Sequence, residues 1–509
     1  MAWLIALGLA TFPGFTSHDS AFMWWMARHD EYWSLWPLGY PLSLRVFREF
    51  LGDVAAPTAL FFGQLLLLAS AVALLCGLVF RPEPVRAVLW TALFLGCPVI
   101  WALVGHLWSD VLLLGVLLLM TALLVWTGNE YGAPQRLRVP VVLSVLTLLG
   151  AYAASLRYNA IVALLPLAWF TFRELASTRL NPQAQTAPAA EAVSTLGREP
   201  PSRAAGSTLR SRLRGLSEAI RRRSRAFGVV MIALIWAFTP WSLNHLARYR
   251  SDTLAFTLIW DVQAVSVAVG RSLLEDGRYA RLAPLEVLRA GYNPAHAVPL
   301  YEQRPLDLPN AATGLTWIER RTLLRIWREA ISEQPLAYLA HRARLAWLLL
   351  RSKTHPSHGG AYEFVQTQFR DNPARHRAWQ GAQHLYQRTV AAWQNAHALS
   401  GGLWLALFGS AALVGLARRK RRLSTDSRRC VGVSGPLDRL AWVLLASAAL
   451  YLLGLFLTAP AADLRYLLWP IGAVWAAAAL AWRPVLPTCL GNDEETVNRQ
   501  SRFAAQKAS

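Results

Sequence analysis

The chain has 509 residues, of which 54% are hydrophobic, only 16% are charged and 23 are tryptophan, and this composition excludes an ordinary soluble enzyme. The net charge of +21 is compatible with nucleic-acid binding, but cationic anchors beside anionic lipid head groups explain it better. We therefore predict an all-α polytopic membrane protein that does not bind nucleic acid.

Ten apolar stretches, each near the length needed to cross a bilayer, follow one another along the chain. A hydrocarbon core about 30 Å thick needs roughly 20 apolar helical residues, because backbone amides have no water partner there. We expect spans at 2–15, 57–80, 87–104, 110–127, 139–155, 159–172, 226–244, 398–417, 439–458 and 464–482. The first, fifth and sixth are short or weakly bounded.

Arginine clusters between alternate spans predict the orientation, since Lys and Arg in short loops stay cytoplasmic. If the spans number ten, four clusters fall on one side: Arg81 with Arg86, Arg136 with Arg138, and the arginine-rich runs 221–225 and 418–422. The other side then receives residues 16–56, 106–110, 245–397 and 459–463. We expect this side to face the periplasm or exterior of a bacterial inner membrane.

Composition divides the chain further. Residues 174–225 are rich in Pro, Ala, Ser, Thr and Gln, which predicts a disordered basic cytoplasmic linker. Residues 245–397 have apolar side chains at amphipathic spacing, which predicts a helical extracytoplasmic insert whose histidines, in no metal-binding pattern, are solvated or interfacial. The other expected parts are an N-terminal transmembrane module with the first outer loop (1–173), a transmembrane helix (226–244), C-terminal transmembrane helices (398–482) and a cytoplasmic tail (483–509).

The loop after the first predicted span holds the best candidate for chemistry, Asp19, preceded by His18. An acidic side chain at the membrane edge is costly to desolvate, which favours a functional role. The alternative is that Asp19 only caps the helix that begins at Ser20 or Ala21. Asp110, at the outer start of the fourth span, has the same two interpretations. The pair is more persuasive than either acid alone, because both lie on the outer face.

Two Arg-Tyr pairs lie on that same face, against the positive-inside trend. Arg157 and Tyr158 separate the fifth and sixth spans, and Arg465 and Tyr466 begin the last one. Such an arginine can snorkel into lipid head groups with no further role, or hold a phosphate through its two-pronged guanidinium. Together the two arginines indicate an anionic ligand at the outer face.

These features resemble the GT-C superfamily of integral-membrane glycosyltransferases, especially the bacterial branch similar to the protein mannosyltransferases and the lipid A aminoarabinose transferase. The chain departs from that branch where it has Asp19-Ser20 in place of Asp-Glu, and Trp36-Pro37-Leu38 in place of a His-Pro-Pro-like element. The matching parts are Asp19, the run 36–42, Asp110, the run 157–159, and Arg465 with Tyr466 and Pro470.

The resemblance implies inverting transfer of one sugar from a polyprenyl-phosphate donor to a glycan, lipid or protein acceptor on the outer face. Asp19 would be the general base, with Asp110 the second catalytic candidate, and Arg465 would stabilise the leaving phosphate. The remaining substrate-binding candidates are His18, Arg157, Tyr158 and Tyr466.

Three points stay open at this level. The sequence requires no cofactor and contains no metal cluster, but some family members use a divalent ion, which Asp19 with His18 or His106 is able to hold. A transporter or flippase of lipid-linked saccharides is one alternative function. A non-catalytic membrane assembly protein that keeps the same fold is the other, and the Ser20 departure makes it credible.

Overall fold

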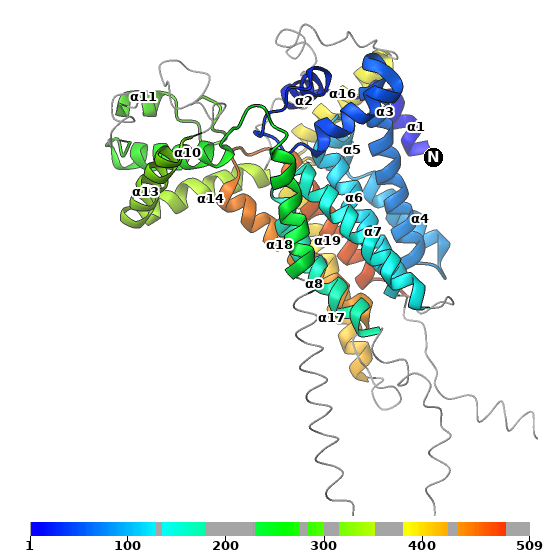
Figure 1. Cartoon of the computed structure of the whole chain (residues 1–509). Helices are drawn as coiled ribbons and strands as arrows, with labels where there is room; N and C mark the ends of the chain where they lie inside the picture. The colour runs from blue at the N-terminus through cyan, green and yellow to red at the C-terminus, as the bar shows by residue number, and fades with distance from the viewer. Residues whose placement is uncertain are drawn as a thin grey trace, which may run out of the picture.

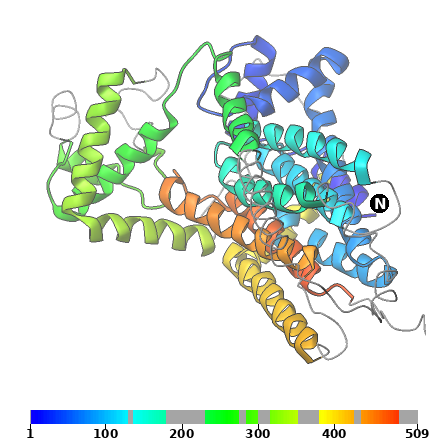
Figure 2. The same cartoon turned by 60° about the horizontal axis from the view of Figure 1, so that its bottom comes forward.

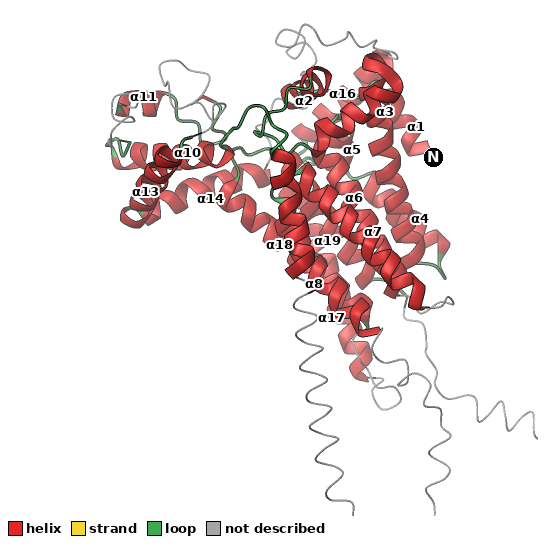
Figure 3. Cartoon of the chain, viewed as in Figure 1, coloured by secondary structure: helices red, strands yellow, loops and turns green. Residues whose placement is uncertain are grey.

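A computed structural model describes residues 2–128, 135–178, 228, 230–274, 284–299, 315–351, 380–425 and 435–484. Within these ranges the regular structure is helical, and extended segments meet only in isolated bridges (Figure 3). The predicted all-α class is confirmed for this part of the chain.

In the described part of the chain, five helices are long and apolar enough to cross a membrane. A sixth span arises if α4 (Pro84–Leu95) and α5 (Pro98–Val104) count as one span, bent by 62° at Gly96 and Cys97. The five are α3 (Gly39–Val79), α6 (Ser109–Gly128), α17 (Gly401–Thr425), α18 (Pro436–Thr458) and the continuous pair η4 (Leu464–Leu467) and α19 (Leu468–Ala481). The chain is a multi-pass membrane protein.

The prediction of ten spans is not confirmed: within the described residues, four of the expected spans are found as shorter apolar helices. They are α1 (Ala2–Thr11), Val141–Leu156 within α7 (Gln135–Leu156), Ala160–Arg173 within α8 (Ala160–Thr178), and the helix Val230–Asn244.

Helix α3 is much longer than the expected span 57–80, and it bends. Gly52 has φ 75°, a left-handed conformation that glycine adopts without a Cβ clash. Pro57 follows within two turns and cannot supply a backbone donor. The bend separates the segment before Gly52 from the long apolar segment after it.

Helix α19 is the centre of the bundle. All of its residues are buried, and it packs on α17, α18 and α6. Its small residues allow close approach: a Cβ on Gly472 would lie 2.5 Å from a Leu114 side-chain carbon. Trp475 stacks on Phe94 with ring centroids 4.3 Å apart. The last helix therefore holds a fixed position, and the turn that leads into it is fixed as well.

The two ends of the bundle differ in charge. Arg81 lies in the turn from α3 to α4, Arg136 in the first turn of α7 and Arg418 near the end of α17, all at the lower end in Figure 1. The arginine-rich run 221–225 lies outside the described residues. The turns that carry the predicted site residues lie at the opposite end.

The described part of the 245–397 insert is helical, as predicted. Helices α10 (Thr253–Val269), α11 (Leu285–Ala290), α13 (Trp317–Glu333) and α14 (Pro335–Arg351) project to one side of the bundle (Figures 1 and 2). Helix α16 (Gln380–Asn395) instead returns to α1 and α5, where the Tyr386 hydroxyl donates to the Ala102 carbonyl at 2.9 Å. Residues 179–225 of the expected linker and residues 485–509 of the expected tail lie outside the described ranges.

Candidate functional site

Four turns meet at the end of the bundle that is remote from the arginine-rich turns. They precede α2 (His18–His29), α6, α8 and η4. The first two are joined by backbone bonds, since Phe15 N donates to the Gly105 carbonyl at 2.8 Å and Leu107 N donates to the Phe15 carbonyl at 2.7 Å. The last is joined to the insert, since Ala462 N donates to the Ala295 carbonyl at 2.7 Å. Backbone pairing thus fixes the site from both sides.

The start of α2 shows that Asp19 is not a helix cap. Ser17 is the N-cap, and it forms a reciprocal capping box with Ser20: Ser17 Oγ accepts from Ser20 N, and Ser20 Oγ accepts from Ser17 N at 2.8 Å. The indole N–H of Trp108 also donates to Ser17 Oγ, at 2.8 Å. The capping interpretation of Asp19 is therefore wrong, and its carboxylate is available for another partner.

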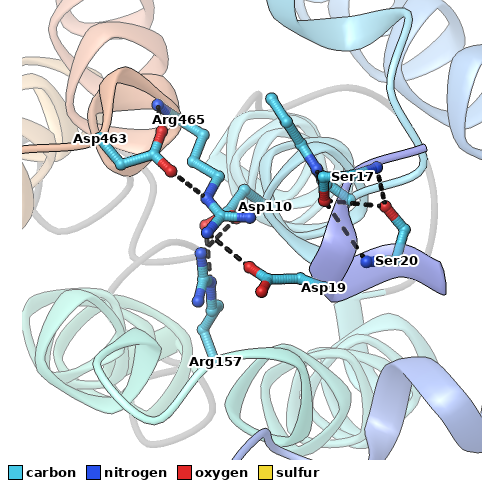
Figure 4. Close-up of polar contacts among 8 residues, drawn as sticks. Ser17, Asp19, Ser20, Asp110, Arg157, Asp463 and Arg465 are labelled. Carbon is cyan, nitrogen blue, oxygen red and sulfur yellow. Dashed lines mark hydrogen bonds and ion pairs between the residues drawn. The ribbon is translucent and has the colours of Figure 1, made fainter. Parts of the chain in front are cut away.

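That partner is Arg465, which forms ion pairs with two carboxylates (Figure 4). Arg465 Nη2 lies 2.6 Å from Asp19 Oδ2, and Arg465 Nε lies 2.7 Å from Asp463 Oδ2. Asp463 also caps η4, with Oδ1 accepting from the Arg465 backbone N–H at 3.1 Å. The Arg465 side chain is 13% exposed and that of Asp19 is 24% exposed. The pair therefore joins the start of the chain to its last span within reach of solvent.

A second ion pair lies beside the first. The Arg157 guanidinium forms a bidentate ion pair with the Asp110 carboxylate. Its Nε donates to Oδ1 at 2.7 Å, and its Nη2 donates to Oδ2. Asp110 is 4% exposed. Burial alone would lower the pKa of Arg157, but the Asp110 carboxylate outweighs burial and raises it. Arg157 therefore stays a cation.

Tyr466 lies between the two arginines. The Arg157 guanidinium carbon is 5.1 Å from the centroid of the Tyr466 ring, and that of Arg465 is 5.6 Å from it. Arg465 also lies over Trp108, 5.3 Å from its ring centroid. Cations at these distances are attracted to aromatic faces. The aromatic rings orient the two guanidinium groups without neutralising them.

Two of the predicted site residues do not join this cluster. The Tyr158 hydroxyl donates to the Ser34 carbonyl at 2.8 Å and accepts from Asn244 Nδ2 at 3.1 Å, so it connects the loop after α2 to the region before α10. His18 is exposed in the first turn of α2. The predicted residues that the structure does bring together are Asp19, Asp110, Arg157, Arg465 and Tyr466.

Sequence reasoning missed three members of the site, namely Asp463, Trp108 and Ser17. Asp463 had a local signal, because an Asp two residues before Arg465 at a helix start is a typical cap. Trp108 and Ser17 had none, because their contact joins segments 91 positions apart.

For a metal ion, the described residues offer no group of three or more His, Cys, Asp or Glu side chains at binding distance. His106, one of the possible ligands, is buried, and its ring stacks on Trp108 with centroids 4.1 Å apart. The Asp19 carboxylate lies against Arg465. In this structure the polar groups of the site are arranged as ion pairs.

The insert contains a second buried polar group. It corrects the expectation of a solvated or interfacial position for one insert histidine, His341, whereas His384 and His397 are exposed. His341 is 4% exposed, and its Nδ1 lies 3.0 Å from the Tyr292 hydroxyl. Burial, with the nearby Arg342 and Arg344, lowers the pKa of His341 to about 3. Next to it, Arg342 Nη2 lies 2.8 Å from Asp261 Oδ2.

Arg342 also reaches the site. Its Nη1 donates to the Ala459 carbonyl at 2.9 Å, at the start of the turn that carries Asp463. The Thr257 hydroxyl donates to the preceding carbonyl, that of Thr458, at 3.1 Å. The insert therefore supports the turn from which Arg465 extends.

Comparisons of the chain with protein-family models, with curated proteins and with solved structures find no match.

Proposed function

We propose that this protein is a membrane glycosyltransferase that transfers one sugar from a polyprenyl-phosphate donor to an acceptor at the outer face of a bacterial inner membrane. The observation that carries the proposal is the position of Arg465, between the carboxylates of Asp19 and Asp463 and beside the Asp110–Arg157 pair. In this proposal Asp19 is the base and Arg465 the anion-binding group, and the two lie together at one end of the helix bundle.

The charge difference between the two ends of the bundle supports the orientation. Arg81, Arg136 and Arg418 lie at the end opposite to Asp19, and such residues stay cytoplasmic. The site then faces the periplasm or exterior, where nucleotide-linked sugars are not the expected donors. The six apolar helices or helix pairs, together with the four shorter apolar helices, form the membrane part in this proposal.

Arg465 suits the phosphate of a lipid-linked donor. A guanidinium offers two parallel donors to phosphate oxygens, and the fixed ring of Tyr466 limits its motion. When the bond from the anomeric carbon to the phosphate oxygen breaks, the leaving polyprenyl phosphate gains negative charge. A cation already in place stabilises that charge without reorganising.

Asp19 suits the role of general base. The acceptor hydroxyl gives its proton to the carboxylate while its oxygen attacks the anomeric carbon, and the phosphate leaves with the bonding electron pair. One direct displacement of this kind inverts the anomeric carbon. The acceptor is a glycan, lipid or protein hydroxyl in this proposal.

The Asp19–Arg465 pair implies that phosphate binding by Arg465 precedes proton abstraction by Asp19. In this structure the Asp19 carboxylate accepts a hydrogen bond from the Arg465 guanidinium at 2.6 Å. A donor phosphate that takes up Arg465 competes with Asp19 for the same N–H groups. Donor binding thus releases the base at the moment when the sugar is in place.

The direct test is a comparison of lipids and glycans, by mass spectrometry, between a strain lacking the gene and its parent. Loss of one sugar from a defined lipid or glycan is the expected result, and restoration by the wild-type gene but not by Asp19→Asn supports the site. Asp53→Asn is the matched control, because Asp53 forms a 2.8 Å pair with Arg48 outside the site. An unchanged glycan profile in the deletion strain would favour a non-catalytic assembly role, and accumulation of an unaltered lipid-linked saccharide would favour a transporter.

A further inference from the structure

Helix α14 buries two polar side chains and exposes three large apolar ones. His341 is 4% exposed and Arg342 is fully buried. On the other side Leu336, Leu339 and Trp347 are 80%, 48% and 58% exposed. Exposed apolar area of this kind on an otherwise folded helix indicates a non-aqueous partner.

The exposed apolar residues form one continuous stripe. Positions three and four apart lie on the same helix face, so Leu336, Leu339, Ala343 and Trp347 follow one line, with the exposed Ala340 beside it. The helix has 17 residues and is therefore about 25 Å long. We name these five residues the α14 stripe.

The α14 stripe continues a surface that faces lipid. Ser400 Oγ donates to the Leu350 carbonyl at 3.1 Å, so the end of α14 meets the start of α17. Leu403 and Leu407, in the first turns of that span, are 44% and 50% exposed, as lipid-facing residues are. In Figures 1 and 2, α14 extends sideways from the bundle toward α13.

Charges beside the stripe fit the surface of a bilayer. Arg344 and Arg351 are exposed, and the Arg351 guanidinium carbon lies 5.2 Å from the Trp347 ring centroid. Tryptophan prefers the boundary between lipid tails and head groups, and arginine extends from there to lipid phosphates. An apolar face with arginines at its margin is typical of a helix that lies in the membrane interface.

We infer that α14 is an interfacial helix whose stripe inserts into the outer leaflet beside α17. On the opposite face of the same helix, Arg342 donates to the Ala459 carbonyl at 2.9 Å. The lipid surface thus supports the turn that carries Asp463 and leads to Arg465. This membrane contact does not depend on the sugar-transfer reaction.

Site-directed spin labelling of the full chain tests the inference. Cys76 and Cys97 are buried, so replacing Cys430 and Cys489 by Ser leaves a background for single cysteines. The chain is reconstituted in vesicles of phosphatidylethanolamine and phosphatidylglycerol with a label at Leu339→Cys or Ala343→Cys. Collision of the label with oxygen, which dissolves in lipid, is compared with collision with a water-soluble nickel chelate.

Two further labels calibrate the measurement. Leu66→Cys on α3 is the lipid control, since Leu66 is 58% exposed within a membrane-crossing segment, and Glu286→Cys on α11 is the water control. We expect both stripe labels to shift toward the oxygen-rich behaviour of the Leu66 label. Stripe labels that behave like the Glu286 label would overturn the inference. Exclusion of both reagents with spin–spin coupling between chains would also overturn it, and would assign the stripe to a second copy.

Discussion

The Asp19 carboxylate lies 2.6 Å from the Arg465 guanidinium, across 446 positions of sequence. In the proposed reaction these two groups have separate partners, the acceptor hydroxyl and the donor phosphate. Because the two groups form an ion pair before substrate binds, substituting one of them removes the ion-pair partner of the other.

Asp19→Asn is expected to separate donor binding from transfer. Removing the base should lower the transfer rate by about 10² to 10⁴. Polyprenyl phosphate should bind more tightly, because a neutral amide competes less strongly than a carboxylate for Arg465. Titration of the purified protein with polyprenyl phosphate, alongside a mass-spectrometric transfer assay, measures both effects. Full product from the Asn variant would remove Asp19 from the mechanism and leave Asp110 as the next candidate.

Arg465→Lys is expected to weaken use of the donor more than use of the acceptor. Lysine keeps the positive charge but loses the paired N–H groups that match a phosphate. The KM for the lipid-linked sugar should rise while the KM for the acceptor changes little. Arg48→Lys, in the ion pair with Asp53, is the control for a general effect of the exchange. Equal changes in both KM values for Arg465→Lys would argue against a phosphate at this residue.

Much of the site followed from sequence because its residues stand at the ends of apolar spans. Asp110 and Arg465 are charges beside long apolar runs, where burial without a partner is costly. The pairing itself did not follow, since Asp19 with Arg465 and Asp110 with Arg157 are tertiary contacts. Tyr158 illustrates the limit: it is adjacent to Arg157, yet its hydroxyl bonds to the Ser34 carbonyl.

For the fold too, local features were predictable from the sequence and tertiary features were not. Long apolar runs identified α6 and α18, because helix length and hydrophobicity are local properties. Hydropathy alone did not reveal the bend at Gly52, which depends on a left-handed backbone, or the burial of His341, which depends on packing within the insert. The number of spans stays a prediction, because length and hydropathy alone identify five or six of the ten expected spans within the described residues.

Asp110→Ala is expected to destabilise the protein because it leaves Arg157 without its carboxylate at a site where Asp110 is 4% exposed. Removing one partner of a buried pair typically costs about 3–5 kcal/mol. Asp53→Ala removes an acid that is 39% exposed and pairs with Arg48 and Arg28, and it should cost about 1 kcal/mol or less per pair. Thermal unfolding in detergent compares the two. The double variant Asp110→Leu with Arg157→Met should recover stability, and a double variant as unstable as Asp110→Ala would contradict this account.

His341 is expected to make the insert less stable in mild acid. Its pKa is lowered from 6.5 to about 3, although Asp261 Oδ1 lies 3.5 Å from its Nε2, because burial and two arginines outweigh that carboxylate. Below pH 6.5 the unfolded chain takes up a proton that the folded insert does not accept until about pH 3. Stability present above pH 6.5 is therefore lost as the pH falls toward 3, by up to about 1.4 kcal/mol per unit.

Unfolding of wild type and His341→Gln between pH 7 and pH 5 isolates this effect, because the carboxylates titrate in both proteins. Glutamine keeps a polar group opposite Tyr292 but takes up no proton. The difference between the two unfolding free energies should shrink or change sign as the pH falls. A difference that stays constant with pH would show that His341 titrates in the folded insert as it does in the unfolded chain.

Reporter fusions are expected to place the site and the arginine-rich turns on opposite sides of the membrane. Fusions near residues 84, 132, 200 and 424 should be cytoplasmic, and fusions near 50, 300 and 461 should be exported, because Arg81, Arg136 and Arg418 stay on the cytoplasmic side. Paired alkaline phosphatase and green fluorescent protein reporters distinguish the two locations. Since Ala462 N donates to the Ala295 carbonyl, the insert and the last turn must lie on one side. An exported 461 fusion with a cytoplasmic 300 fusion would contradict the fold. A cytoplasmic signal at both positions would instead place Asp19 and Arg465 on the cytoplasmic side, where a lipid-linked donor is not required.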